Sequence, residues 1–235
     1  MIPIYVGYDS GESVAYHVFC QSVISKASVP VSFHPLSLNM LDYKETHTDG
    51  SNAFIYSRFL VPHLQGYQGW AIFCDGDMIL NADIAELWAL RDPYMAVQVV
   101  KHDYKTKHHT KYLGAKNEDY PRKNWSSVML INCSHFAWRL ITPEYVQTET
   151  GSHLHRFEFM ADDRIGELPK EWNWLVEEYE HNDDAKLYHY TIGTPCFKEF
   201  EKCDHASVWH KEHEKTNFCK QLFRVLQQPF IGSRC

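Results

Sequence analysis

Two aspartates separated by one glycine, Asp75-Gly76-Asp77, are the residues best suited to chemistry in this chain of 235 residues. They directly follow the apolar run 70–74, which is typical of a strand covered on both faces. Carboxylate oxygens at such a place suit Mg²⁺ or Mn²⁺, ions that often bridge to a substrate diphosphate. Because a deep carboxylate pair costs free energy without a compensating cation, we expect a divalent-cation site here. The alternative is an acidic turn whose carboxylates accept backbone N–H groups.

Short apolar runs and helical patterns supply the elements that must position this pair. Strands are predicted over 2–8, 31–36, 70–74, 96–100, 128–131 and 185–188. Helices are predicted from Ser13, as a candidate N-cap, onward, over 54–64 with a break or kink at Pro62, and over 84–90. A final helix capped by Thr216 would carry Phe218, Leu222, Val225 and Leu226 on one face. The polar stretch 39–52 is predicted to be a loop.

The alternation of strands and helices predicts an α/β fold with a mostly parallel central sheet flanked by helices. The chain has no internal repeat and no linker rich in Gly, Ser or Pro, so we expect one domain over 1–235 with a helical extension at about 205–235. Ligands of such sheets bind at the carboxyl ends of strands, where both Asp9 and Asp75 fall. One crevice could therefore hold both carboxylates.

Composition narrows the class of protein. The formal net charge of −7 argues against a general nucleic-acid binder. Seven scattered cysteines, an odd number, indicate mostly free thiols in a reducing compartment. The chain has neither the roughly 20 consecutive apolar residues of a spanning helix nor the N-terminal pattern of a signal peptide. We expect a soluble cytoplasmic protein, while docking on a membrane surface and the oligomeric state stay open.

Four sequence blocks occur in an informative order. They are Tyr56-Ser57-Arg58-Phe59, then 71–88 with the aspartate pair and a Leu-Trp end, then 127–132 ending in Ile-Asn, and then 187–193 with His189 and Gly193. Together with the first strand, this order resembles nucleotide-sugar glycosyltransferases of the GT-A fold, and family 8 most closely. The resemblance covers residues 2 to about 197 and is far more specific than any one block.

The resemblance implies a metal-dependent glycosyltransferase that moves a sugar from a UDP-sugar to a saccharide or other hydroxyl acceptor, with retention at the anomeric carbon. It implies that Mn²⁺ or Mg²⁺ is held by Asp75, Asp77 and His189. It places Arg58 at the donor phosphates, a task that suits a guanidinium. The donor-binding residues that it implies are Gly7, Tyr8 and Asp9 at the nucleotide base, with Arg58, Asp75 and Gly76.

Other residues match the family's pattern less closely. Asp162 and Asp163 fall where the family has acidic residues near the reacting sugar carbon, although an acidic pair also suits a helix start. His189 and Arg58 have structural alternatives too: a satisfied histidine at a strand end, and a surface arginine paired with a carboxylate. The segment 172–174, Trp-Asn-Trp, resembles a short element that could offer a sugar platform or simply belong to the core.

The chain departs from the family where the donor diphosphate is expected. The family's lysine soon after the final glycine is missing from 193–197, and Lys198 is displaced. The segment 101–123 is a candidate replacement, because six lysines and Arg122 against three acids give it a charge of about +4. A solvated lysine-rich loop is the alternative. A group of histidines and cysteines matches no zinc-finger spacing, so we predict no zinc site among Cys203, His205, His210, His213 and Cys219.

Two other functions stay open from the sequence. A sugar-phosphate nucleotidyltransferase has a similar core, but its opening Gly-rich loop carries Arg and is followed by Lys, which the segment 7–11 does not match. A non-catalytic module that binds nucleotide sugars or carbohydrate would keep the fold without turnover.

Overall fold

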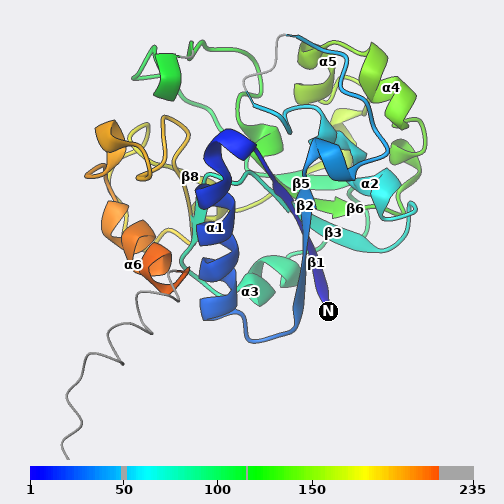
Figure 1. Ribbon diagram of the computed structural model, residues 1–235. Helices are drawn as coiled ribbons and strands as arrows, with labels where there is room; N and C mark the ends of the chain where they lie inside the picture. Colours follow the sequence, from blue (N-terminus) through cyan, green and yellow to red (C-terminus); the bar gives the residue numbers. More distant parts are fainter. Residues whose placement is uncertain (49–51, 115, 217–235) are drawn as a thin grey trace, which may run out of the picture.

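The computed structural model describes residues 1–48, 52–114 and 116–216 (Figure 1). The strands are β1 (Ile2–Gly7), β2 (Val31–Leu36), β3 (Trp70–Cys74), β4 (Met78–Leu80), β5 (Val97–Val99), β6 (Val128–Asn132), β7 (Ile165–Glu167), β8 (Trp174–Leu175) and β9 (Leu187–His189). The α-helices are α1 (Ser13–Lys26), α2 (Val61–Leu64), α3 (Ile84–Ala89), α4 (Pro143–Thr148), α5 (Gly151–His155) and α6 (Ala206–Thr216).

The central sheet has six strands in the order β2-β1-β3-β6-β5-β7. The pairs β1–β2, β1–β3 and β5–β7 are parallel, and β6 is antiparallel to both of its neighbours. The predicted α/β fold with a mostly parallel sheet is therefore confirmed. A smaller sheet, β4-β9-β8, was not predicted as a unit, because its strands are two or three residues long and β4 pairs with β9 across more than a hundred residues of chain.

Side chains that alternate along the central strands build a core on each face of the sheet. Tyr5 and Phe73 belong to the cluster that α4 and α5 complete, whereas Ile4 and Ile72 belong to the cluster that α1 and α3 complete. Burying one such side chain contributes roughly 1.5–3 kcal/mol. Burial on both faces explains why the run 70–74 is apolar without interruption. Helix α6 packs against α1 at the edge of the molecule (Figure 1).

Several expected boundaries are wrong in detail. The segment expected as one helix over 54–64 forms a 3₁₀ turn, Ser57–Leu60, followed by α2. Pro62 lies in the first turn of α2, where its missing N–H has no partner to lose, so it starts a helix and does not kink one. Ser13 is the first residue of α1, and Glu12 occupies the N-cap position without a side-chain bond.

The structure describes only the first part, up to residue 216, of the helical extension expected at about 205–235. Helix α6 lies in the extension expected at about 205–235. The final helix expected after Thr216 lies outside the described residues. Within the described part of the chain, no helix is both long and apolar enough to cross a bilayer.

Candidate active site

Sheet pairing brings the two aspartates and His189 together. Strand β3 ends at Cys74, and the chain passes through Asp75, Gly76 and Asp77 into β4 of the smaller sheet. Antiparallel pairing sets Met78 opposite His189, so the imidazole lies beside Asp77. His189 Nε2 is 3.3 Å from Asp77 Oδ1 and 4.0 Å from Asp75 Oδ2.

Gly76 is required by the close approach of the motif to β1. A Cβ atom on Gly76 would lie 2.5 Å from the carbonyl oxygen of Gly7, and backbone at this position cannot move aside easily. A Cβ atom on Gly7 would in turn collide with the ring of Phe54. The two predicted glycines therefore pack together. Because neither has a side chain, the aspartate pair can lie directly against the end of β1.

The three side chains have the chemistry of a divalent-cation site. One ligand atom from each lies within 4.8 Å of the others. Oδ1 of each aspartate is buried and makes no hydrogen bond of good geometry, although Arg58 Nη1 lies 2.9 Å from Asp75 Oδ1 and His189 Nε2 lies 3.3 Å from Asp77 Oδ1. His189 Nδ1 lies 3.0 Å from Asn173 Oδ1, which can only accept, so Nδ1 carries the proton and Nε2 is free to ligate. Two carboxylates and an imidazole are a reasonable donor set for Mn²⁺ or Mg²⁺. Asn173 is a positioning residue that the sequence did not assign.

The two carboxylates titrate differently. Burial raises the pKa of Asp75 to about 6, and the charge of Asp77 adds to this rise, while Arg58 and His189 oppose it. Burial also opposes ionisation of Asp77, but His189 and Lys111 outweigh it and hold the pKa of Asp77 below its usual value. Asp77 is thus ionised near neutral pH, whereas the charge of Asp75 depends on cations around it.

Arg58 is directed at a carboxylate. Its Nη1 lies 2.9 Å from Asp75 Oδ1, and its Nε and Nη1 donate to the carbonyl oxygens of Ile55 and Ser126, at 3.0 Å each. The side chain is buried beside the rings of Phe54 and Phe73. Arg58 lines the cavity, but its partner in the structure is the carboxylate of Asp75. This matches the alternative that Arg58 pairs with a carboxylate, except that the pair is buried and not at the surface.

A cavity of about 590 Å³ opens over the aspartates and His189. The basic segment 101–123 contributes three cations to its wall, namely Lys111, Lys116 and Lys123. Lys111 Nζ donates to Thr191 Oγ1 at 3.1 Å, two residues beyond His189. Burial lowers the pKa of Lys111, whereas the nearby Asp77 and Asp75 oppose that change. The segment therefore brings positive charge to the cavity wall beside Thr191.

Residues 12–195 match the sequence profile described as Glycosyl transferase family 8. The chain belongs to glycosyltransferase family 8. A relative in Arabidopsis thaliana, Protein CDI, is 42% identical over 224 residues, which cover 91% of this chain and 86% of that protein.

Solved glycosyltransferases share the GT-A fold of this family member. The apo structure of the bifunctional WbbM matches with a TM-score of 0.66 at 15% identity, over 95% of this chain and 51% of that one. The chain thus spans about half the length of WbbM. The galactosyltransferase LgtC in complex with donor and acceptor sugar analogs matches with a TM-score of 0.56 at 12% identity, over 91% and 96% of the two chains.

The residues predicted to hold the nucleotide base lie at the end of β1. Asp9 accepts the backbone N–H groups of Gly11 and Ala53, at 2.8 and 2.9 Å, and Tyr8 packs edge-on against Tyr16. The adjoining void of about 10 Å³ is no larger than about one water. Asp9 therefore fixes the loop around Ala53, and its contact with a base stays a prediction.

The two predicted catalytic aspartates lie at the surface. The side chains of Asp162 and Asp163 are 80% and 72% exposed, and neither lines the 590 Å³ cavity. Arg122 joins Asp162 to the cavity rim, because it donates both to Asp162 Oδ1 and to the carbonyl oxygen of Arg156, at 2.6 Å each. The structure does not bring these aspartates to Asp75, Asp77 and His189, and their contact with sugar stays a prediction.

Proposed function

We propose that this family 8 glycosyltransferase uses a UDP-sugar and a divalent cation, Mn²⁺ or Mg²⁺, and transfers the sugar with retention to a saccharide or other hydroxyl acceptor. The observation that carries the proposal is the convergence of Asp75, Asp77 and His189 in one cavity, where one ligand atom of each lies within 4.8 Å of the others. A cation held there would neutralise the charge that develops on the leaving diphosphate.

The chain itself supplies further positive charge to the donor. Lys111 lies beside the aspartates and Thr191, so its ammonium is placed to donate to a diphosphate oxygen. Arg58 keeps Asp75 ionised from behind, since a buried carboxylate with a raised pKa would otherwise hold a proton. In this proposal Lys111 takes the role of the lysine that the family has after the final glycine. Arg58 acts indirectly, by keeping Asp75 ionised.

Retention is compatible with the groups in the cavity. The bond between the anomeric carbon and the β-phosphate oxygen breaks, and the acceptor hydroxyl forms its bond on the same face. The departing phosphate oxygen takes the hydroxyl proton, so no protein base is required. Asp162 and Asp163 remain candidates for contact with sugar hydroxyls, because Arg122 connects Asp162 to the cavity rim.

A panel of nucleotide sugars, tested with and without Mn²⁺, examines the proposal. Titration calorimetry should show Mn²⁺-dependent binding of UDP, and a chromatographic assay should show UDP release when a matching donor and acceptor are supplied. Asp77→Asn should abolish the Mn²⁺ dependence, whereas exposed Asp42→Asn, at another cavity, should leave it unchanged. Unfolding temperatures of the metal-free variants control for folding.

Three results would refute particular parts of the proposal. Equal UDP affinity with and without Mn²⁺ in the parent would remove the metal role. Binding of a UDP-sugar without hydrolysis or transfer, over a broad acceptor panel, would indicate the non-catalytic module. Release of diphosphate from UTP and a sugar phosphate would indicate the nucleotidyltransferase.

A further inference from the structure

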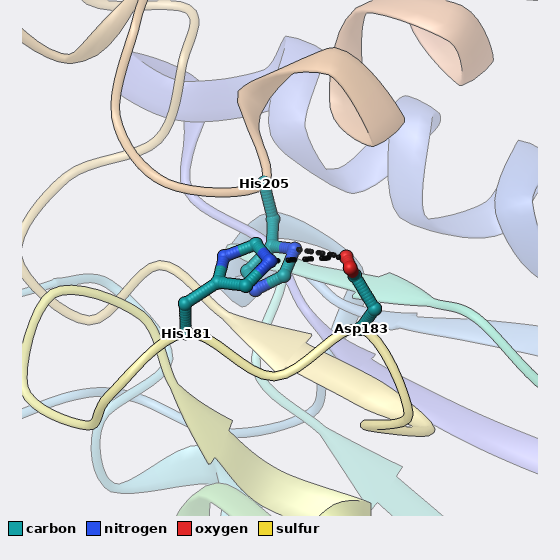
Figure 2. Close-up of side chains that lie close together, drawn as sticks. All are labelled: His181, Asp183 and His205. Atoms are coloured by element: carbon teal, nitrogen blue, oxygen red, sulfur yellow. Dashed lines mark ion pairs between the residues drawn. The ribbon is translucent and has the colours of Figure 1, made fainter.

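A second group of metal-ligating side chains lies apart from the proposed active site. His181 and Asp183 belong to the loop before β9, and His205 immediately precedes α6 (Figure 2). One ligand atom from each lies within 4.8 Å of the others. None of the three lines the cavity over Asp75 and Asp77, so their chemistry is not explained by sugar transfer.

The two imidazoles form a stacked pair between two carboxylates. Their ring centres are 4.4 Å apart and their planes differ by 11°. On one side, Asp183 Oδ1 lies 3.2 Å from His181 Nε2 and 3.9 Å from His205 Nδ1. On the other side, Asp204 lies 2.7 Å from His181 Nδ1 and 3.3 Å from His205 Nε2. Each carboxylate therefore faces one nitrogen of each ring.

This arrangement determines which nitrogen of each imidazole ring carries the proton. Asp204 accepts a hydrogen bond from His181 Nδ1 and lies nearest to Nε2 of His205, so a neutral ring of either residue carries its proton on the Asp204 side. The remaining nitrogens, His181 Nε2 and His205 Nδ1, then present lone pairs toward Asp183. A cation between these nitrogens and Asp183, either a metal ion or the extra proton of a charged His181, satisfies these atoms. A carboxylate that orients the distal nitrogen of a ligating histidine is a recurring feature of zinc sites.

His205 is the firmly held member of the group. Its side chain is only 3% exposed, its ring stacks on Tyr188 at 4.0 Å, and its Nε2 faces Asp204 at 3.3 Å. Tyr188 also donates to the carbonyl oxygens of Asn182 and Asp183, at 3.2 Å each, so one side chain supports both the loop and the buried imidazole. The ring is therefore held with Nδ1 toward Asp183, as a ligand would require.

We infer that His181, Asp183 and His205 form a second metal site that takes Zn²⁺ or a similar borderline cation, with Asp204 as the residue that orients both imidazoles. Zinc lies about 2.1 Å from nitrogen and oxygen ligands, so two ligands of a tetrahedral ion are roughly 3.4 Å apart. Asp183 Oδ1 lies 3.2 and 3.9 Å from the two nitrogens, and the exposed His181 and Asp183 can adjust to the ion. Three protein ligands leave the fourth tetrahedral position to water.

The bound ion would have a structural effect. It would tie the loop that carries His181 and Asp183 to the start of α6 through His205, a link between segments more than twenty residues apart. Burial lowers the pKa of His205, which favours the neutral ring that a metal requires. Asp204 and Asp183 raise the pKa of His181, so protons compete with the metal as the pH falls.

The test is a Zn²⁺ titration at pH 7.5. The background protein is the full chain with Asp77→Asn, which removes a ligand of the first site, and it is freed of metal beforehand. The background protein should bind one Zn²⁺ and melt at a higher temperature when it is loaded. His181→Ala should remove this binding and the rise in melting temperature. Asp204→Asn should weaken affinity about 10–100-fold. The exposed His17→Ala and Asp184→Asn serve as matched controls and should bind as the background does.

Cobalt provides an independent readout of the ligands. Co²⁺ in the site should show the visible d–d bands of a tetrahedral nitrogen and oxygen environment, and His181→Ala should abolish them. A thiolate charge-transfer band would mean that cysteines hold the ion, which would overturn the inference. Unchanged Zn²⁺ affinity in His181→Ala would overturn it as well. Because no result here depends on UDP or sugar transfer, failure of this site and failure of the proposed function are distinguishable.

Discussion

Removal of the Arg58 guanidinium should destabilise the protein through Asp75. Arg58 is 4% exposed and Asp75 is 8% exposed, and 2.9 Å separates Arg58 Nη1 from Asp75 Oδ1. Breaking a buried pair by removing one partner costs about 3–5 kcal/mol, because the other charge stays buried without compensation. Asp75 can avoid part of this cost by taking up a proton, so we expect Arg58→Met to lower the free energy of unfolding by about 2–3 kcal/mol at pH 7.5, in metal-free buffer.

The same reasoning gives this loss a pH dependence. Without Arg58, the pKa of Asp75 in the folded protein rises further above its present value of about 6, while its unfolded value stays near 3.8. The penalty is then largest above the folded pKa and disappears as the pH falls toward the unfolded value. Urea unfolding at pH 5 and 7.5 should show a smaller loss at the lower pH.

A double-mutant cycle tests the pair directly. Asp75→Asn removes the carboxylate charge, so Arg58→Met should cost about 1–3 kcal/mol less in that background than in the parent. Arg91→Met is a matched control, because Arg91 is exposed and packs over Trp88 at 4.1 Å, and it should cost less than about 1 kcal/mol. Additive effects of Arg58→Met and Asp75→Asn, with no dependence on pH, would refute the account of Arg58 given above.

Three further substitutions examine the cavity and its surroundings. Lys111→Met should weaken the binding of UDP about tenfold or more and leave uridine binding nearly unchanged, as measured by calorimetry; equal losses would indicate a structural role. Gly76→Ala should destabilise the protein by about 1–3 kcal/mol in urea unfolding, since the new Cβ meets the Gly7 carbonyl, and an unchanged midpoint would contradict that contact. Burial and the charge of Asp77 raise the pKa of Glu12 from 4.5 to about 7, so its ionisation destabilises the fold increasingly as the pH rises between those values. Glu12→Gln should gain up to about 3 kcal/mol in stability over the parent above pH 7 and little at pH 4.5, whereas parallel pH profiles would refute the shift.

The parts of the fold that the sequence predicts are those with a strong local pattern. Strand β3 is recognisable because both of its faces are buried, and the aspartate pair follows it directly. Strand β9 was predicted, over 185–188, but its sheet was missed because β4 has three residues and β8 has two, too few for a period to show. The pairing of Met78 with His189 decides the geometry of the site, yet it is a long-range contact that no local pattern encodes.

Side-chain partners were harder to predict than side-chain types. The sequence analysis gave two anionic partners for Arg58, the donor phosphates and a carboxylate. Because a guanidinium binds both kinds of group, the residue type alone did not distinguish them. The sequence also indicated that the basic segment 101–123 supplies charge, without showing that Lys111 is the residue beside Thr191. The histidine and cysteine group at 203–219 matches no zinc-finger spacing, and its last member, Cys219, lies outside the described residues. His205 instead lies with His181 and Asp183, because the chain folds back before α6.

The charges in the cavity explain how an acidic chain can bind an anionic donor. The whole chain has a net charge of −7, whereas the described wall of the cavity carries more cations than carboxylates. The cations are Arg58, Lys111, Lys116, Lys123 and Arg156, and the carboxylates are Asp75, Asp77 and Glu118. A divalent cation and a diphosphate of two negative charges leave this balance unchanged when they bind together, but either alone shifts it by two charges. Electrostatics in a cavity of low dielectric therefore favours joint binding of metal and donor, and the Mn²⁺ and UDP-sugar affinities should each rise in the presence of the other by the same factor.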